Sequence, residues 1–186
     1  QLSSQNPVNQ TQHFWQNLLI LFLNPLWLIE FIGNQHNDLW MLLPALGSLY
    51  LIWPARTSKI LSPSLFSTLL SVGLLAFSIE TKLATVVLLP VWVLIWLRKI
   101  PQHWAVFASL LLFVLLLTPR SQLFHPWYLS WALIWLPFLK TKNWRVLLLL
   151  LSFTSLFRYL PWILAGGFSE DVVTQQRLIT WSGVLV

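Results

Sequence analysis

The polar side chains able to do chemistry gather in one fifteen-residue stretch, from Asn24 to Asp38. It holds the carboxylates of Glu30 and Asp38, the imidazole of His36 and several amides, including those of Asn24, Asn34 and Asn37. Long apolar runs lie on both sides, and polar groups are costly to hold near hydrocarbon, so this grouping indicates a functional site. A polar loop between two membrane helices remains the alternative, with Asp38 as N-cap of the helix that follows.

The remainder of the chain has the composition of an integral membrane protein. Of its 186 residues, 57% are hydrophobic and 9% are charged, whereas soluble domains carry about 25% charged residues. Thirteen tryptophans agree with the aromatic belts at membrane interfaces. The absence of cysteine excludes disulfides and thiolate metal sites. The net charge of +6 lies in short loops and does not indicate nucleic-acid binding.

The hydropathy pattern predicts an all-α fold, a polytopic transmembrane helix bundle. Residues 1–13 are polar and predict a loop, and residues 14–186 predict the transmembrane helical domain. We expect about seven membrane helices and the truncated start of an eighth, each shorter than or close to the ~20 residues that cross a bilayer. The expected helices cover 14–31 (broken at Asn24-Pro25), 39–53, 64–79, 83–97, 104–117, 127–139, 146–160 and a run from 178 onward.

If these helices alternate in direction, the loops form two groups of different charge. One group holds seven basic residues and no acid: Arg56, Lys59, Arg98, Lys99, Lys140, Lys142 and Arg145. The other holds all five acids with four basic residues: Glu30, Asp38, Glu80, Glu170, Asp171, Lys82, Arg120, Arg158 and Arg177. Short basic loops stay in the cytoplasm, so the second group, with His36 and His125, is expected on the extracytoplasmic face.

Three motifs resemble a known family. The sequence NPLWLIE (24–30) followed by GNQHND (33–38) is similar to the "NPxxxxE…GNxHND" signature of bacterial polyprenol-phosphate-mannose-dependent mannosyltransferases, in the GT-C superfamily of membrane glycosyltransferases. A lysine opening an apolar run, Lys82, and the segment HPWYLSW (125–131) occur in the same order in that family. The chain lacks an acidic residue before Glu30, where this family places its catalytic acid. We therefore expect a fragment, with the N-terminal part and the primary base upstream of it.

The resemblance implies transfer of a mannose-like hexose from a polyprenyl-phosphate donor to a hydroxyl of a glycan or lipid acceptor, with inversion. It would occur at the extracytoplasmic face of a bacterial plasma membrane, among membrane lipids. A carboxylate would act as base, and cations would stabilise the departing phosphate. Catalytic candidates are Asp38, His36 and Glu30; substrate-binding candidates are Asn24, Asn34, Asn37, Lys82, Arg120, His125, Trp127 and Tyr128.

Several alternatives stay open at this point. Arg120 is the favoured phosphate partner because its guanidinium can bind two oxygens, although it could instead anchor at the membrane interface. Lys82 could simply pair with Glu80. A divalent cation held by His36 and Asp38 is conceivable, but two ligands give weak support for a metal site. The competing functions are a transporter or flippase of a lipid-linked or small polar substrate, and a non-catalytic membrane subunit.

Overall fold

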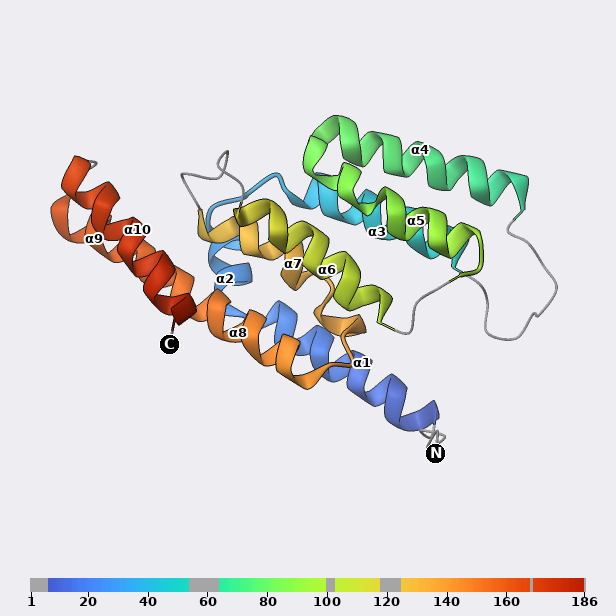
Figure 1. Cartoon of the computed structure of the whole chain (residues 1–186), viewed down its shortest axis with the longest axis horizontal. Helices are drawn as coiled ribbons and strands as arrows, with labels where there is room; N and C mark the ends of the chain where they lie inside the picture. The colour runs from blue at the N-terminus through green and yellow to red at the C-terminus, as the bar shows by residue number, and fades with distance from the viewer. Residues whose placement is uncertain (1–6, 54–63, 100–102, 118–124, 168, 186) are drawn as a thin grey trace.

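The computed structural model describes residues 7–53, 64–99, 103–117, 125–167 and 169–185, and its regular structure in these ranges is helical throughout (Figure 1). The N-terminal half contains α1 (Pro7–Phe22), α2 (Pro25–Trp27), the π-helix η1 (Leu28–Gly33), α3 (Leu39–Ile52), α4 (Leu65–Thr81), the 3-10 helix η2 (Leu83–Leu88) and α5 (Leu89–Trp96). The C-terminal half contains α6 (Trp104–Val114), η3 (Leu115–Leu117), η5 (Pro126–Leu129), α7 (Ser130–Leu133), η6 (Leu136–Phe138), α8 (Lys142–Leu156), η7 (Phe157–Tyr159), α9 (Leu160–Ala165) and α10 (Glu170–Leu185). The all-α prediction is confirmed.

Helix α1 begins at Pro7, so residues 7–13, expected as a loop, are helical. Proline suits the first turn of a helix, because its missing N–H has no partner there. The predicted break at Asn24-Pro25 is present. Asn24 caps α2 by accepting a hydrogen bond from the Leu26 N–H at 2.9 Å. The axis bends by 50° between 11–22 and 25–33, which turns Glu30 toward the interior.

Helices α3 and α4 pack as an antiparallel hairpin through small residues. The Ser48 and Ser71 hydroxyls lie 3.0 Å apart, and a Cβ on Gly47 would come within 3.3 Å of Leu74. Small residues let apolar helices approach closely, as is typical of helix packing in membranes. This contact brings the start of α3, where Asp38 lies, beside the end of α4, where Lys82 lies.

The segment from Pro126 to Leu139 differs most from its prediction. A membrane helix was expected over 127–139, but the structure divides the segment into η5, α7 and η6, and every residue from Leu129 to Pro137 is buried. Prolines 126 and 137 lack the amide hydrogen that would continue a helix. The Ser109 hydroxyl of α6 donates to the Ala132 carbonyl at 3.0 Å, which holds this segment inside the helical core.

The number of membrane spans predicted from the sequence is not confirmed. Within the described ranges, one continuous helix, Lys142–Ala165, is long and apolar enough to cross a bilayer, and the bent pair Thr11–Phe22 and Pro25–Gly33 adds a second if it is one span. The other apolar helices have 10–17 residues: Leu39–Ile52, Leu65–Thr81, Leu83–Trp96 and Trp104–Leu117. Bends and short 3-10 turns shorten these helices, and the hydropathy pattern does not indicate where such turns occur.

Candidate functional site

Glu30 is completely buried in the π-helix η1. The Asn34 N–H donates to the Ile29 carbonyl at 2.8 Å, and this i to i+5 bond widens the turn. Such π-turns are frequent at functional sites, because they re-aim a side chain that an α-helix would direct elsewhere. A carboxylate without solvent contact needs protein donors for its oxygens.

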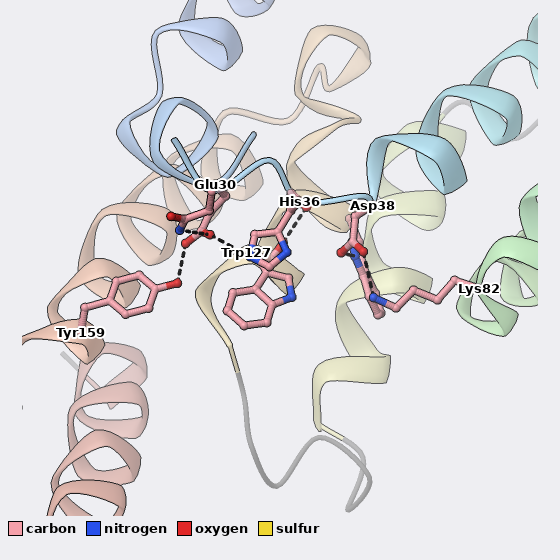
Figure 2. Close-up of polar contacts among 9 residues, drawn as sticks. Glu30, His36, Asp38, Lys82, Trp127 and Tyr159 are labelled. Carbon is pink, nitrogen blue, oxygen red and sulfur yellow. Dashed lines mark hydrogen bonds and ion pairs between the residues drawn. The ribbon is translucent and has the colours of Figure 1, made fainter. Parts of the chain in front are cut away.

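Three donors surround the Glu30 carboxylate (Figure 2). The Tyr159 hydroxyl donates to Oε1 at 2.5 Å, and the Asn34 amide donates to Oε2 at 3.0 Å. His36 Nε2 lies 3.3 Å from the same Oε2. We call these four residues the Glu30 cluster. It joins η1 and the following turn to η7, which is 129 residues away in the chain.

The turn between η1 and α3 places His36 beside Glu30 through its backbone. Gln35 adopts φ = 52°, a left-handed conformation that residues other than glycine rarely adopt. The next residue, His36, then donates its N–H to the Glu30 carbonyl at 3.0 Å. The imidazole is 24% exposed, whereas Glu30 has no solvent contact, so solvent reaches this contact from the side of His36.

Asp38 is the residue before α3, as predicted, but its side chain does not cap the helix. The Lys82 ammonium donates to Oδ1 at 2.9 Å, and the Trp131 indole N–H donates to Oδ2 at 2.7 Å (Figure 2 shows the Asp38–Lys82 contact). Asp38 is 2% exposed. The capping alternative therefore does not explain this carboxylate, and neither does the alternative pairing of Lys82 with the exposed Glu80.

Lys82 lies between a carboxylate and two aromatic rings. Its Nζ is 5.0 Å from the ring centre of Tyr128 and 4.8 Å from that of Trp131, within the range of cation–π attraction. The side chain is 35% exposed, so the cation keeps access to solvent while Asp38 holds its position. We call Asp38, Lys82, Tyr128 and Trp131 the Asp38 cluster.

Trp127 connects the two clusters. Its ring stacks on the His36 imidazole and on the His125 imidazole, each with centres 4.1 Å apart. Further along the chain, the rings of Tyr128 and Trp131 pack 4.8 Å apart. The segment 125–131 thus forms an aromatic row from the Glu30 cluster to the Asp38 cluster, and three separate sequence motifs meet in one place.

His125 is half-buried beside other cationic groups. Burial lowers the pKa of His125 below its usual 6.5, and electrostatic repulsion from Arg158, and from His36 when His36 is protonated, lowers this pKa further. The imidazole is therefore mainly neutral at pH 7. As a substrate-binding candidate, His125 can offer hydrogen bonds and not a full positive charge.

Not every predicted site residue joins these clusters. Asn24 donates to the Ser152 hydroxyl at 2.8 Å and caps α2, so both ends of its amide hold the fold. Asn37 is exposed at the turn before α3. Arg120, the favoured phosphate partner, lies outside the described residues.

A cation bridging His36 and Asp38 does not fit their geometry. His36 faces Glu30, whereas both Asp38 oxygens accept hydrogen bonds from Lys82 and Trp131. Among the residues that the structure describes, no three His, Cys, Asp or Glu side chains are grouped as metal ligands.

Sequence reasoning missed Tyr159 and the burial of Arg158. Arg158 was expected in an outer loop, but it is 3% exposed and donates to the Gln176 carbonyl at 2.9 Å. An Arg-Tyr pair inside an otherwise apolar run was the available signal, since such groups are rare in lipid-facing helices. Trp131 belonged to the recognised HPWYLSW segment, but pairing with Asp38 requires the fold to be known.

Comparisons with known proteins identify the family of this chain. The family model "Alpha-(1->6)-mannopyranosyltransferase, N-terminal domain" matches residues 2–98, just over half of the chain. The match includes the 24–38 stretch and Lys82, whereas the segment 125–131 lies beyond it. Searches of curated proteins and of solved structures gave no match. On the strength of the family match, the chain belongs to the alpha-(1->6)-mannopyranosyltransferase family.

Proposed function

We propose that this chain transfers mannose from a polyprenyl-phosphate donor to a hydroxyl of a glycan acceptor, with inversion at the anomeric carbon. The observation that carries the proposal is the pairing of each buried carboxylate with a partly exposed basic group. Glu30 supports His36, and Asp38 supports Lys82. An acceptor hydroxyl needs a base and a departing lipid phosphate needs a cation, and the two pairs offer one of each.

His36 is the proposed general base. Its Nε2 faces Glu30, which leaves Nδ1 as the ring nitrogen to take the proton of the acceptor hydroxyl. The imidazolium that forms lies beside a carboxylate with no solvent contact, so the new charge is stabilised in a medium that screens weakly. Glu30 is then a positioning residue, because its oxygens already accept hydrogen bonds from Tyr159 and Asn34 and contact His36.

Lys82 is the proposed phosphate partner. Its ammonium carries three donor hydrogens, and the 2.9 Å contact with Asp38 Oδ1 uses one. The remaining hydrogens are available to phosphate oxygens as the bond to the sugar breaks and negative charge grows on the phosphate. Asp38 is nearly without solvent contact, so it orients Lys82 rather than binding sugar.

The active face is proposed to be extracytoplasmic. The site joins the start of α3, the end of α4, the 125–131 segment and the end of the α8–η7 helix, which lie at one end of the alternating helices. Arg98 and Lys99 follow α5 at the other end. Basic loops favour the cytoplasmic side, which leaves the site facing outward.

The test is transfer by the purified protein in lipid nanodiscs. Synthetic polyprenyl-phosphate mannose and an α-mannoside acceptor should give an elongated mannoside, and NMR of the product should show the anomeric configuration opposite to that of the donor. If the protein used nucleotide-linked mannose and not the polyprenyl-phosphate mannose, the proposed lipid donor would be wrong. If the product kept the anomeric configuration of the donor, the proposed inversion would be wrong.

The identity of the base has a separate test. His36→Gln keeps a polar side chain but cannot hold the proton, so kcat should fall about 100-fold or more, on the scale of lost general-base catalysis. His103→Gln, which makes the same change at an exposed side chain outside both clusters, is the control. A His36→Gln enzyme within tenfold of wild type would assign the base to another group, such as the upstream acid implied by the resemblance.

A further inference from the structure

A groove of about 880 Å³ lies between α1 and α8, and none of its lining residues belongs to the Glu30 cluster. The two helices run in the same direction (Figure 1), and two side-chain hydrogen bonds link this part of the fold. Arg145 Nη1 donates to Asn17 Oδ1 at 3.0 Å, and Asn24 Nδ2 donates to Ser152 Oγ at 2.8 Å. The groove lies along this pair of contacts.

The groove is polar at one end and mainly apolar along the rest, where Asn24 is a further polar residue in the lining. Its polar end has His13, Gln16, Asn17 and Arg145, and its apolar walls have Leu19, Ile20, Leu23, Leu149 and Phe153. On α8, Arg145, Leu149 and Phe153 are spaced by four residues and share one face. A ligand that matches both parts has a polar head and a hydrocarbon chain.

The charge at the polar end is not neutralised by the protein residues described. Arg145 bonds the neutral amide of Asn17, and its buried Nε has no hydrogen-bond partner within the described ranges. Arg145 lies in the first turn of α8, which contains no acidic residue. Since the N-terminus of a helix carries partial positive charge, a cation there is unfavourable unless an anion lies nearby. The head group that fits is therefore anionic.

The length of the groove indicates a lipid of one leaflet. From His13 to Leu23 the α1 helix rises about 15 Å at ~1.5 Å per residue, which is half of the ~30 Å hydrocarbon core of a bilayer. The polar end would then lie at one membrane surface and the apolar end near the middle. A phospholipid acyl chain extends over this depth.

We propose that an anionic phospholipid binds in the α1–α8 groove, with its phosphate at Arg145 and an acyl chain against Ile20 and Leu149. The site is distinct from the mannosyl transfer site and does not depend on the proposed function. It links α1, which leads into η1 and Glu30, to α8, which leads into η7 and Tyr159. The bound lipid thereby stabilises the two segments that meet in the Glu30 cluster.

Native mass spectrometry of the detergent-purified full chain tests the proposal. Phosphatidylglycerol and phosphatidylcholine with identical acyl chains are offered in equal amounts, and wild type should retain phosphatidylglycerol roughly fivefold better, the scale of one basic residue facing an anionic lipid. Arg145→Gln should abolish this preference. Lys142→Gln removes the same charge about one turn earlier on α8, from an exposed side chain outside the groove. This variant should keep the preference for phosphatidylglycerol.

A second variant fills the groove without changing its charge. Ile20 lines the groove and is 44% exposed, so Ile20→Trp should reduce retention of both lipids while circular dichroism stays unchanged. Inorganic phosphate in millimolar excess should not displace bound phosphatidylglycerol, because it lacks the acyl chain. Equal losses in Arg145→Gln and Lys142→Gln, full retention in Ile20→Trp, or displacement by free phosphate would each overturn the proposal.

Discussion

The Asp38 carboxylate and the Lys82 ammonium lie 2.9 Å apart although 44 residues separate them in the chain. Helices α3 and α4 fill that interval as a tight hairpin, so the contact between the two helices sets the distance between the two charges. The pair is asymmetric: Asp38 is 2% exposed and Lys82 is 35% exposed. This asymmetry leaves the ammonium accessible to solvent while the carboxylate is buried, as the role proposed for Lys82 requires.

Asp38→Asn separates the two explanations of this carboxylate. Asn is nearly as good an N-cap as Asp, so a capping residue would tolerate the change. If Asp38 instead accepts hydrogen bonds from Lys82 and Trp131, the change should be harmful, because Asn offers one acceptor oxygen to two donors. We expect the free energy of unfolding to fall by about 1–3 kcal/mol and transfer to fall by about 100-fold. Thermal unfolding and initial rates measure the two effects.

The matched control for this change is Glu80→Gln. Glu80 is an exposed carboxylate two residues before Lys82, and it loses the same charge. The free energy of unfolding should stay within a few tenths of a kcal/mol of wild type. The transfer rate should stay within about twofold of wild type. Similar losses in both variants would indicate a general effect of negative charge near Lys82 and not the specific pair.

Lys82→Met should raise the KM for the lipid donor by tenfold or more, since the phosphate loses its cation. The single change also leaves the buried Asp38 carboxylate without its cationic partner, so the free energy of unfolding should fall as well. The double variant Asp38→Leu with Lys82→Met removes that penalty and should recover the midpoint of unfolding without recovering donor affinity. Recovery of both properties would show that Lys82 is structural alone. Lys99→Met, exposed at the other end of the helices, is the control.

Tyr159→Phe tests the support of Glu30. The ring is kept and the hydroxyl that donates to Oε1 is lost, leaving a buried carboxylate with one donor fewer. We expect a loss of about 1.5–3 kcal/mol in the free energy of unfolding, typical of a hydrogen bond to a charged group. Denaturant titration measures it. Tyr50→Phe makes the same change at a side chain that is 80% exposed and should cost close to nothing.

The lowered pKa of His125 predicts a pH dependence of stability. In the unfolded chain His125 binds a proton near pH 6.5, and in the folded protein it binds one only at lower pH. Between these two pKa values the unfolded state holds more protons, so stability is full above about pH 6.5 and falls as the pH is lowered. His125→Gln should flatten the thermal midpoint between pH 5 and 7. An unchanged slope would place the titrating group elsewhere, and His103→Gln, at an exposed site, serves as comparison.

Membrane orientation is testable because the chain has no cysteine of its own. Asn37→Cys, exposed at the turn beside the Glu30 cluster, should react with an impermeant maleimide added to intact cells. Lys99→Cys should react only after the cells are permeabilised. The reverse pattern would place the site in the cytoplasm and contradict the use of the basic loops as cytoplasmic markers.

The sequence by itself determined the helical class, most helix positions and the motif residues. Helix signals are local: proline and asparagine at 24–25 and long apolar runs act over a few residues, so the break before α2 and the helices from α3 to α6 follow from composition and spacing. The three motifs likewise indicated a mannosyltransferase, and the family match includes two of them.

Only the tertiary structure decided which charge pairs with which. Whether Asp38 caps its helix or binds Lys82 depends on the packing of α3 against α4, and the two outcomes are compatible with the same local sequence. Tyr159 reaches Glu30 across 129 residues, and residues 129–137 are buried rather than facing lipid. Burial and pairing arise from contacts between distant elements, and neither hydropathy nor motif spacing records which elements meet.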